Sequence, residues 1–219
     1  HRHFARGQVR CLQHLPQEKR ESDYLSIELK LLQLEILERY YSNDVIDDFV
    51  SKNISNYRFR EIAIQRKLKK GHYDDVITLC LEGELLDAKS LGVLSIWKNY
   101  RYEAYEGKED IQSQKQLGRE LLIKGEYKYY EKLKSLYMPE EWDIVLEEIL
   151  TSFKSPYTYG TYVAILIDAQ KSDKLLSYCK EREHEIERLY PYLIKKYPAE
   201  VERIFSEYIL AYSKKCTNR

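Results

Sequence analysis

Apolar residues recur at the spacing of an α-helix along most of this chain, and this pattern limits the possible folds more than any other feature. From Ser22 onward the apolar side chains follow the i, i+4, i+7 rule. Only 8 Gly and 5 Pro are present, which leaves little material for the many tight turns of an all-β fold. The pattern therefore predicts an all-α protein of about ten to twelve helices.

The segment 22–41 predicts one long helix with two apolar stripes on opposite sides. The first stripe is Leu25, Leu29, Leu32, Ile36 and Tyr40, and the second is Ile27, Leu31, Leu34 and Tyr41. A helix with two opposed stripes needs a neighbour on each side to bury them. We therefore expect an inner helix that is packed on both sides.

Other helix starts follow from proline and capping residues. Helices are predicted to begin at Pro139 and Pro198, because proline suits the first helical position and the glutamates that follow suit the positive end of the helix dipole. A short helix is predicted after a cap at Asn43 or Asp44. By periodicity the segment 162–167 fits a buried strand as well as a buried helix. We assign it to a helix because no partner strand is seen elsewhere in the chain.

Three short blocks resemble one another and predict a repeated architecture. Residues 70–79 and 124–133 both begin with Lys-Gly-x-Tyr after a helix end that contains leucine, and residues 169–178 form a weaker copy. The offsets are 54 residues (125 minus 71) and 45 residues (170 minus 125). Tetratricopeptide repeats have a period of about 34, whereas HEAT-like units run to about 40–47. Chance similarity between amphipathic helices is the alternative explanation.

From these blocks we predict an irregular, right-handed α-α superhelix, which is a solenoid of antiparallel helix pairs of the HEAT/TPR-like kind. It is expected to form a single helical repeat domain over residues 22–219. The preceding residues 1–21 carry more basic than acidic side chains and lack helical periodicity. They are predicted to be a basic, poorly ordered lead-in.

Several blocks are similar to the helical C-terminal region of bacterial SWIM zinc finger proteins. They are 70–77 (Lys-Gly-His-Tyr-Asp-Asp-Val-Ile), 97–98 (Trp-Lys), 101–105 (Arg-Tyr-Glu-Ala-Tyr), 118–122 (Gly-Arg-Glu-Leu-Leu), 197–201 (Tyr-Pro-Ala-Glu-Val), 208–209 (Tyr-Ile) and 218–219 (Asn-Arg). The similarity covers roughly residues 57–219. The zinc motif of that family, Cys-x-Cys followed by Cys-x-His, would lie upstream and is not found in this sequence. The resemblance therefore implies a scaffold or interaction segment, with no metal ligand and no catalytic residue carried over.

Charge and hydropathy limit the partners that we expect. The chain has 36 basic and 36 acidic residues, so it lacks the excess of positive charge with which nucleic-acid binders neutralise phosphates. No apolar run approaches the length of a membrane span, and no signal peptide is recognisable. The sequence begins at His1, not Met, and we expect it to be part of a larger protein. Nucleic acid is then expected to be contacted only by a domain upstream of it.

The cysteines and histidines suggest candidate metal sites, each with a simpler alternative. The four cysteines, Cys11, Cys80, Cys179 and Cys216, lie far apart without a Cys-x-x-Cys pair. We predict that they are free thiols in a reducing cytoplasm, each acting as a small buried hydrophobe. Cys11 and His14, together with His1 and His3, have half of a zinc spacing, and the alternative is a solvated tail.

A second metal candidate comes from helical spacing. Glu181 and His184 form a Glu-x-x-His pair on one predicted helix face, as in di-iron bundles, but only one copy exists. A surface pair is therefore the favoured explanation.

Two further groups of residues suggest binding surfaces. The basic cluster consists of Arg58, Arg60, Arg66, Lys67, Lys69 and Lys70. It suits a phosphate or an acidic partner, but a charged helix face is favoured. The 21 tyrosines are the unusual feature of the composition. Two dense groups of them are candidates to line a groove, although packing between helices is the favoured explanation. These groups are Tyr100, Tyr102 and Tyr105, and Tyr127, Tyr129 and Tyr130.

The sequence as a whole predicts a non-catalytic, cytoplasmic scaffold without a cofactor that binds a protein or peptide. It contains no nucleophile elbow, P-loop or dinucleotide fingerprint. The alternative function is an accessory domain of a nucleic-acid-associated zinc finger protein. No catalytic, cofactor-binding or metal-binding residue is assigned.

Overall fold

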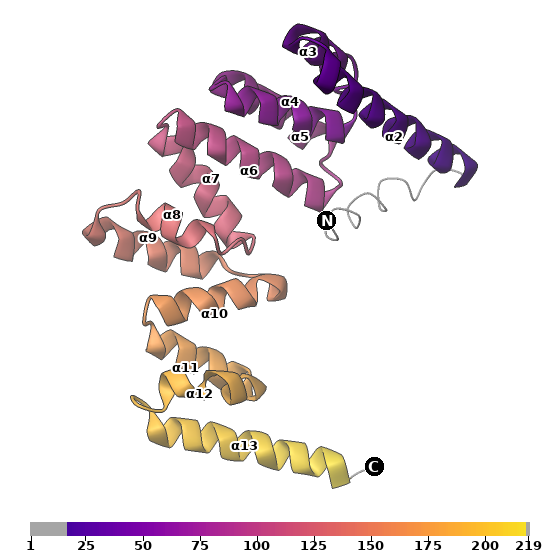
Figure 1. Cartoon of the computed structure of the whole chain (residues 1–219). Helices are drawn as coiled ribbons and strands as arrows, with labels where there is room; N and C mark the ends of the chain where they lie inside the picture. The colour runs from indigo at the N-terminus through magenta and orange to yellow at the C-terminus, as the bar shows by residue number, and fades with distance from the viewer. Residues whose placement is uncertain (1–16, 218–219) are drawn as a thin grey trace. The chain divides into compact units, whose positions relative to one another are not determined.

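The computed structural model describes residues 17–217, with side chains described over 25–214, and all regular secondary structure in this part of the chain is helical (Figure 1). It contains twelve α-helices and two 3-10 helices, and no strand within the described range. The all-α prediction is confirmed. The ambiguous segment 162–167 lies in a helix, as predicted.

The chain divides into two compact units, His1–Leu117 and Gly118–Arg219, whereas the sequence predicts one repeat domain. The helices of unit 1 are α2 (Gln17–Tyr40), α3 (Asn43–Lys52), α4 (Tyr57–Lys69), α5 (Tyr73–Leu86) and α6 (Leu91–Gly107). Each of these helices packs against the next one along the chain (Figure 1). Helix α7 (Ile111–Ile123) begins in unit 1 and ends in unit 2.

Unit 2 continues with shorter helices. They are α8 (Tyr129–Lys134), α9 (Pro139–Ser152), α10 (Tyr159–Asp168), α11 (Ser172–Glu181), α12 (Ile186–Leu193) and α13 (Pro198–Thr217), with 3-10 helices η1 (Pro156–Thr158) and η2 (Glu183–Glu185). Helices α10 to α13 again pack in chain order. The helix starts predicted at Pro139 and Pro198 are confirmed. Helix α3 begins at Asn43 with Ser42 as its cap, so the predicted caps lie one or two residues too late.

Helix α2 differs from its prediction in two ways. It begins at Gln17, so residues 17–21 of the expected lead-in are helical, and residues 1–16 lie outside the described part. The first stripe is exposed along its whole length: Leu25 60%, Leu29 66%, Leu32 55%, Ile36 55% and Tyr40 76%. Among the described residues, only the second stripe has a neighbour, where Leu34 is buried against Ile46 and Val50 of α3. The expectation of packing on both sides is therefore wrong for the described residues, because α2 is the first helix of the described stack.

The Lys-Gly turns have the geometry that their sequence predicts. Gly71 has φ +74° and Gly125 has φ +102°, a left-handed backbone that glycine adopts without a steric penalty. At the first turn the N–H of His72 donates to the carbonyl of Lys67, and the N–H of Gly71 donates to that of Leu68, both at 3.0 Å. This pair of bonds is the Schellman motif, which satisfies carbonyl groups left open at a helix end.

The same pair of hydrogen bonds recurs at three more helix ends. The bonds run from Glu126 to Leu121 and Gly125 to Leu122, from Lys171 to Leu166 and Gln170 to Ile167, and from Asp110 to Tyr105 and Glu109 to Glu106. The weaker third copy at Gln170 (φ +53°) is therefore a turn of the same kind. The fourth, at Glu109 (φ +56°), was missed because glutamate is not a residue typical of this conformation.

Helices α5 and α6 pack closely against each other, and two glycines allow their approach. A Cβ atom on Gly83 would lie 2.8 Å from Nε1 of Trp97, which is fully buried. A Cβ atom on Gly107 would overlap the ring of Tyr73. The Nε1–H of Trp97 donates to Asp87 (2.8 Å), so the same indole is packed on one side and hydrogen-bonded at its edge.

A buried charge is fixed beside this indole. The side chain of Arg60 is 3% exposed, lies 3.9 Å from the Asp87 carboxylate and has its guanidinium carbon 6.0 Å from the centre of the Trp97 ring. Next to it, Arg101 makes two hydrogen bonds with Glu84, at 2.7 and 3.0 Å. These contacts join α4, α5 and α6. They also place each buried or half-buried charge beside an opposite one, which a charge removed from water requires.

The first prediction concerns the left-handed turn. Gly71→Ala is expected to lower the free energy of unfolding by about 1–2 kcal/mol, because an alanine Cβ disfavours positive φ. No neighbouring atom lies within 4 Å of the added Cβ, so a steric clash does not contribute. Gly92→Ala, in α6 and with equally open surroundings, is the control and is expected to raise stability by about 0.5–1 kcal/mol. Urea denaturation measures both. Equal effects of the two variants would contradict the role given to the turn.

The second prediction concerns the contact between α5 and α6. Gly83→Ala is expected to destabilise unit 1 by about 1–3 kcal/mol, because the new methyl group overlaps the Trp97 ring. In a double-mutant cycle with Trp97→Phe, the two losses should be less than additive by about 0.5 kcal/mol or more. Additive losses in thermal or urea unfolding would show that the glycine is not needed for the indole.

Candidate functional site

The cysteine candidates are partly described. Cys80 and Cys179 are free and buried, which confirms the prediction of small buried hydrophobes for these two. Burial raises the pKa of the Cys80 thiol to about 12 and that of Cys179 to about 11. The candidate site of Cys11, His1, His3 and His14, and the side chain of Cys216, lie outside the described residues.

The Glu-x-x-His pair does not share one helix face. Helix α11 ends at Glu181, Arg182 leaves the helical conformation with φ −137°, and His184 lies in η2. The two side chains line a hollow of about 330 Å³ with Tyr208 and Tyr212 of α13. Within the described part of the chain, no group of three or more His, Cys, Asp or Glu side chains is placed to hold a metal ion. The predicted helical spacing was wrong because the helix ends between the two residues.

The basic cluster is largely neutralised by carboxylates of unit 1. The pairs are Arg58 with Glu28, Arg60 with Asp87, Arg66 and Lys70 with Asp47, and Lys67 with Asp75. The hydrogen bond from Lys70, followed by that from Arg66, holds the pKa of Asp47 below its usual value. The hydrogen bond from Lys67 does the same to the pKa of Asp75. Positive charge that is paired in this way offers little to a phosphate backbone.

The first tyrosine group takes part in packing. Tyr102 is buried in α6, and its pKa is raised to about 12 by desolvation. The hydroxyl of Tyr100 accepts a hydrogen bond from Gln65 (2.6 Å) and donates one to Glu61 (2.9 Å), both on α4. These contacts join α6 to α4, as the packing explanation requires.

The second tyrosine group belongs to a cluster of rings in unit 2. Tyr127 stacks on Tyr130 with ring centres 5.7 Å apart and an interplanar angle of 12°. Tyr130 meets Trp142 edge to face at 5.7 Å, and Tyr137 lies 5.9 Å from the same indole. Tyr129 is buried and does not line the hollow. The rings of Tyr130, Tyr137 and Trp142 form one wall of an open hollow.

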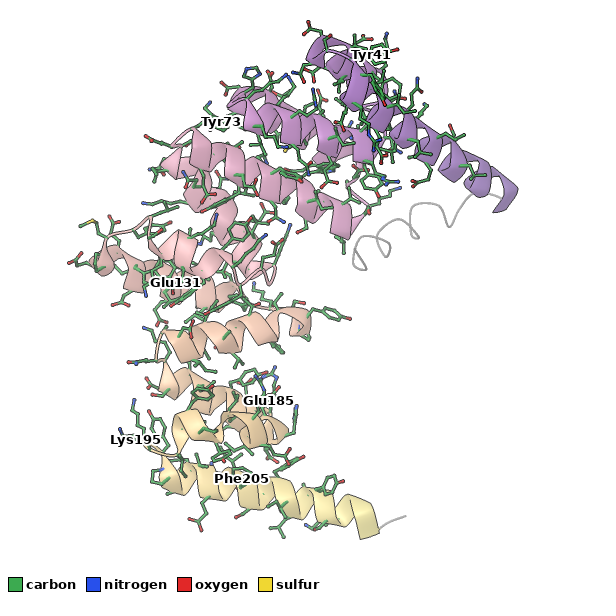
Figure 2. All side chains as sticks on the ribbon, in the orientation of Figure 1. Tyr41, Tyr73, Glu131, Glu185, Lys195 and Phe205 are labelled. Carbon is green, nitrogen blue, oxygen red and sulfur yellow. The ribbon has the colours of Figure 1, made fainter. Side chains whose placement is uncertain are left out.

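This hollow is called the Trp142 pocket below. Its volume is about 590 Å³. Pro139 and Leu146 extend its apolar surface, while Glu131, Lys134, Asp143 and Asp168 supply charge at its edge. All of these residues belong to unit 2. Figure 2 labels Glu131 on α8, where it marks this edge.

Local sequence explains how the Trp142 pocket is built. The left-handed turn at Gly125 ends α7 and leads into α8, which carries Tyr130. Pro139 starts α9, so that Trp142 falls in the first turn of that helix. The left-handed turn after α10 brings Ala169 and Gln170 into the lining. Two of the four repeated turns therefore shape the pocket.

The pocket is electrically negative at its aromatic wall. Desolvation and then the charges of Glu131, Asp168 and Asp143 raise the pKa of Tyr130. The hydroxyl of Tyr127 donates a hydrogen bond to Asp168. Desolvation, followed by this hydrogen bond, raises the pKa of Tyr127. The ammonium of Lys134 lies 5.9 Å from the centre of the Tyr130 ring.

Sequence reasoning found only part of this site. The density of tyrosines pointed to Tyr130, but Trp142, Tyr137 and the carboxylates were not singled out as site residues. Trp142 is buried, so its ring belongs to the core as well as to the wall of the pocket. Residues 130–146 and 168–170 meet at the pocket because the chain reverses direction between them. No short sequence motif in these segments predicts a pocket.

No described helix combines the length and the low polarity that crossing a membrane requires. Comparisons of the chain with protein-family models, with curated proteins and with solved structures gave no match in any of the three. The resemblance to the SWIM zinc finger proteins therefore stays a prediction, and the function has to be argued from the residues of the chain itself.

Proposed function

We propose that this chain is a non-catalytic helical-repeat scaffold, an irregular α-α superhelix within a larger cytoplasmic protein, that binds a segment of a protein or peptide. The observation that carries this proposal is the Trp142 pocket, an open hollow with a wall of three aromatic rings and a charged edge. Binding sites are typically concave and apolar, with a few polar groups that fix orientation.

Two properties of the pocket favour a peptide segment as its ligand. Its aromatic residues are of the kinds that are enriched in protein interfaces, where a large ring gives contact area at little entropic cost. The pocket is also open to solvent, because one edge of it is formed by exposed residues such as Glu131 and Ser135. A side chain of the partner can therefore enter the pocket while the partner's backbone stays outside.

The titratable groups favour binding over catalysis. Burial raises the pKa of both described cysteines, so their thiols stay protonated near neutral pH. A catalytic cysteine needs the opposite shift, because the thiolate is the nucleophile. The tyrosines around the pocket are likewise shifted away from their charged form.

The third prediction tests the proposed function with a matched pair of variants. Random peptides of about twelve residues are displayed and selected on the full chain, and the recovered peptides are measured by fluorescence anisotropy. Ser135→Trp is expected to weaken their binding by about tenfold or more, because the new ring fills the pocket. Ser177→Trp should leave binding unchanged. Both serines are exposed, and each donates to a backbone carbonyl of its own helix region.

Two results of this selection would contradict the proposed function. If no peptide is enriched, or if the recovered peptides bind Ser135→Trp as tightly as the unchanged chain, the Trp142 pocket is not a peptide site. Circular dichroism of both variants verifies that the helical content is retained.

A further inference from the structure

We infer that the Trp142 pocket receives a cationic side chain of its partner, with arginine preferred. This inference rests on the proposed function, because it names the chemistry of the segment that the same pocket would bind. It identifies the ligand as a basic peptide and sets it apart from an acidic or a purely apolar one.

The charges at the edge of the pocket are the first argument. Three carboxylates, those of Glu131, Asp143 and Asp168, line the hollow against one ammonium, that of Lys134. Their charges converge on Tyr130, since all three raise the pKa of its hydroxyl. A cation in the hollow would therefore enter a negative potential at short range.

The wall of the pocket is the second argument. Arginine has an apolar stem and a planar guanidinium, so it can lay its stem against rings while its head reaches carboxylates. Tyr130, Tyr137 and Trp142 supply the rings. Exposed carboxylates are supplied by Glu131, which follows Tyr130 in the sequence, and by Asp143, which follows Trp142. The guanidinium fork matches a carboxylate with two parallel hydrogen bonds, which an ammonium cannot do.

The chain itself supplies a precedent for a cation at this position. The ammonium of Lys134 lies near the ring of Tyr130, where the ring quadrupole attracts positive charge. An incoming arginine would meet this ammonium as a like charge and as a competitor for the same carboxylates. Removal of Lys134 should therefore strengthen binding, whereas removal of the carboxylates should weaken it.

The fourth prediction uses a small probe that isolates the cation. The full chain is labelled with 5-fluorotryptophan, which gives one fluorine signal for each of its 2 tryptophans, and Trp97→Phe assigns them. N-acetyl-arginine amide is expected to shift the Trp142 signal in a saturable manner and to leave the Trp97 signal in place. N-acetyl-citrulline amide has nearly the same shape without the charge. It should bind more weakly by about fivefold or more.

Charge variants give effects of opposite sign in the same titration. The double variant Glu131→Gln with Asp143→Asn should weaken the arginine probe by about fivefold or more, and raising the NaCl concentration should weaken it further. Lys134→Met should strengthen it by about twofold or more. The controls are Glu140→Gln, on the same helix as Asp143 but outside the lining, and Lys154→Met, and neither should change the affinity.

The results separate this inference from the proposed function. If the citrulline probe binds as tightly as the arginine probe, if no probe shifts the Trp142 signal, or if Lys134→Met weakens binding, the inference is overturned. If the selected peptides bind Ser135→Trp more weakly but show no enrichment of arginine or lysine, the inference is overturned while the proposed function stands. Failure of the peptide selection together with a saturable arginine shift would overturn the proposed function alone.

Discussion

The chain depends on one repeated backbone constraint, a left-handed residue that closes a helix with two hydrogen bonds. At Gly71, Glu109, Gly125 and Gln170 the same pair of N–H groups returns to the preceding helical turn, and the chain is redirected into the next helix. A helix end without such partners would leave carbonyl groups unsatisfied. Because two of these turns use residues other than glycine, the surrounding packing has to hold them in a conformation that their side chains disfavour.

Close packing between α5 and α6 is the second requirement, and it is local to unit 1. The absence of a side chain at Gly83 and at Gly107 leaves room for the rings of Trp97 and Tyr73. The indole that gains this room then supports the buried Arg60 and its carboxylate partner. The guanidinium of Arg60 is thus buried beside a carboxylate and an aromatic ring, and both offset part of the cost of removing its charge from water.

In unit 2 the same kind of turn has a different consequence. The chain reversals at Gly125 and Gln170 bring α8, the start of α9 and the end of α10 around the Trp142 pocket. Two of the three rings of its wall, those of Tyr130 and Trp142, are also buried in the core, so the hollow is held by rigid parts of the unit. A site on such a support can accept a side chain without first having to order its own wall.

The sequence by itself determined the helical class, the starts at Pro139 and Pro198, three of the four turns and the burial of Cys80 and Cys179. These features depend on local spacing and on the backbone preferences of single residues, which a sequence displays directly. Only the tertiary structure decided that the first stripe of α2 lies exposed, that the basic cluster is paired with acids, and that Trp142 joins three carboxylates around one hollow. Each of these depends on which residues meet across helices, and helical periodicity shows that a face is apolar or charged without showing what lies opposite it.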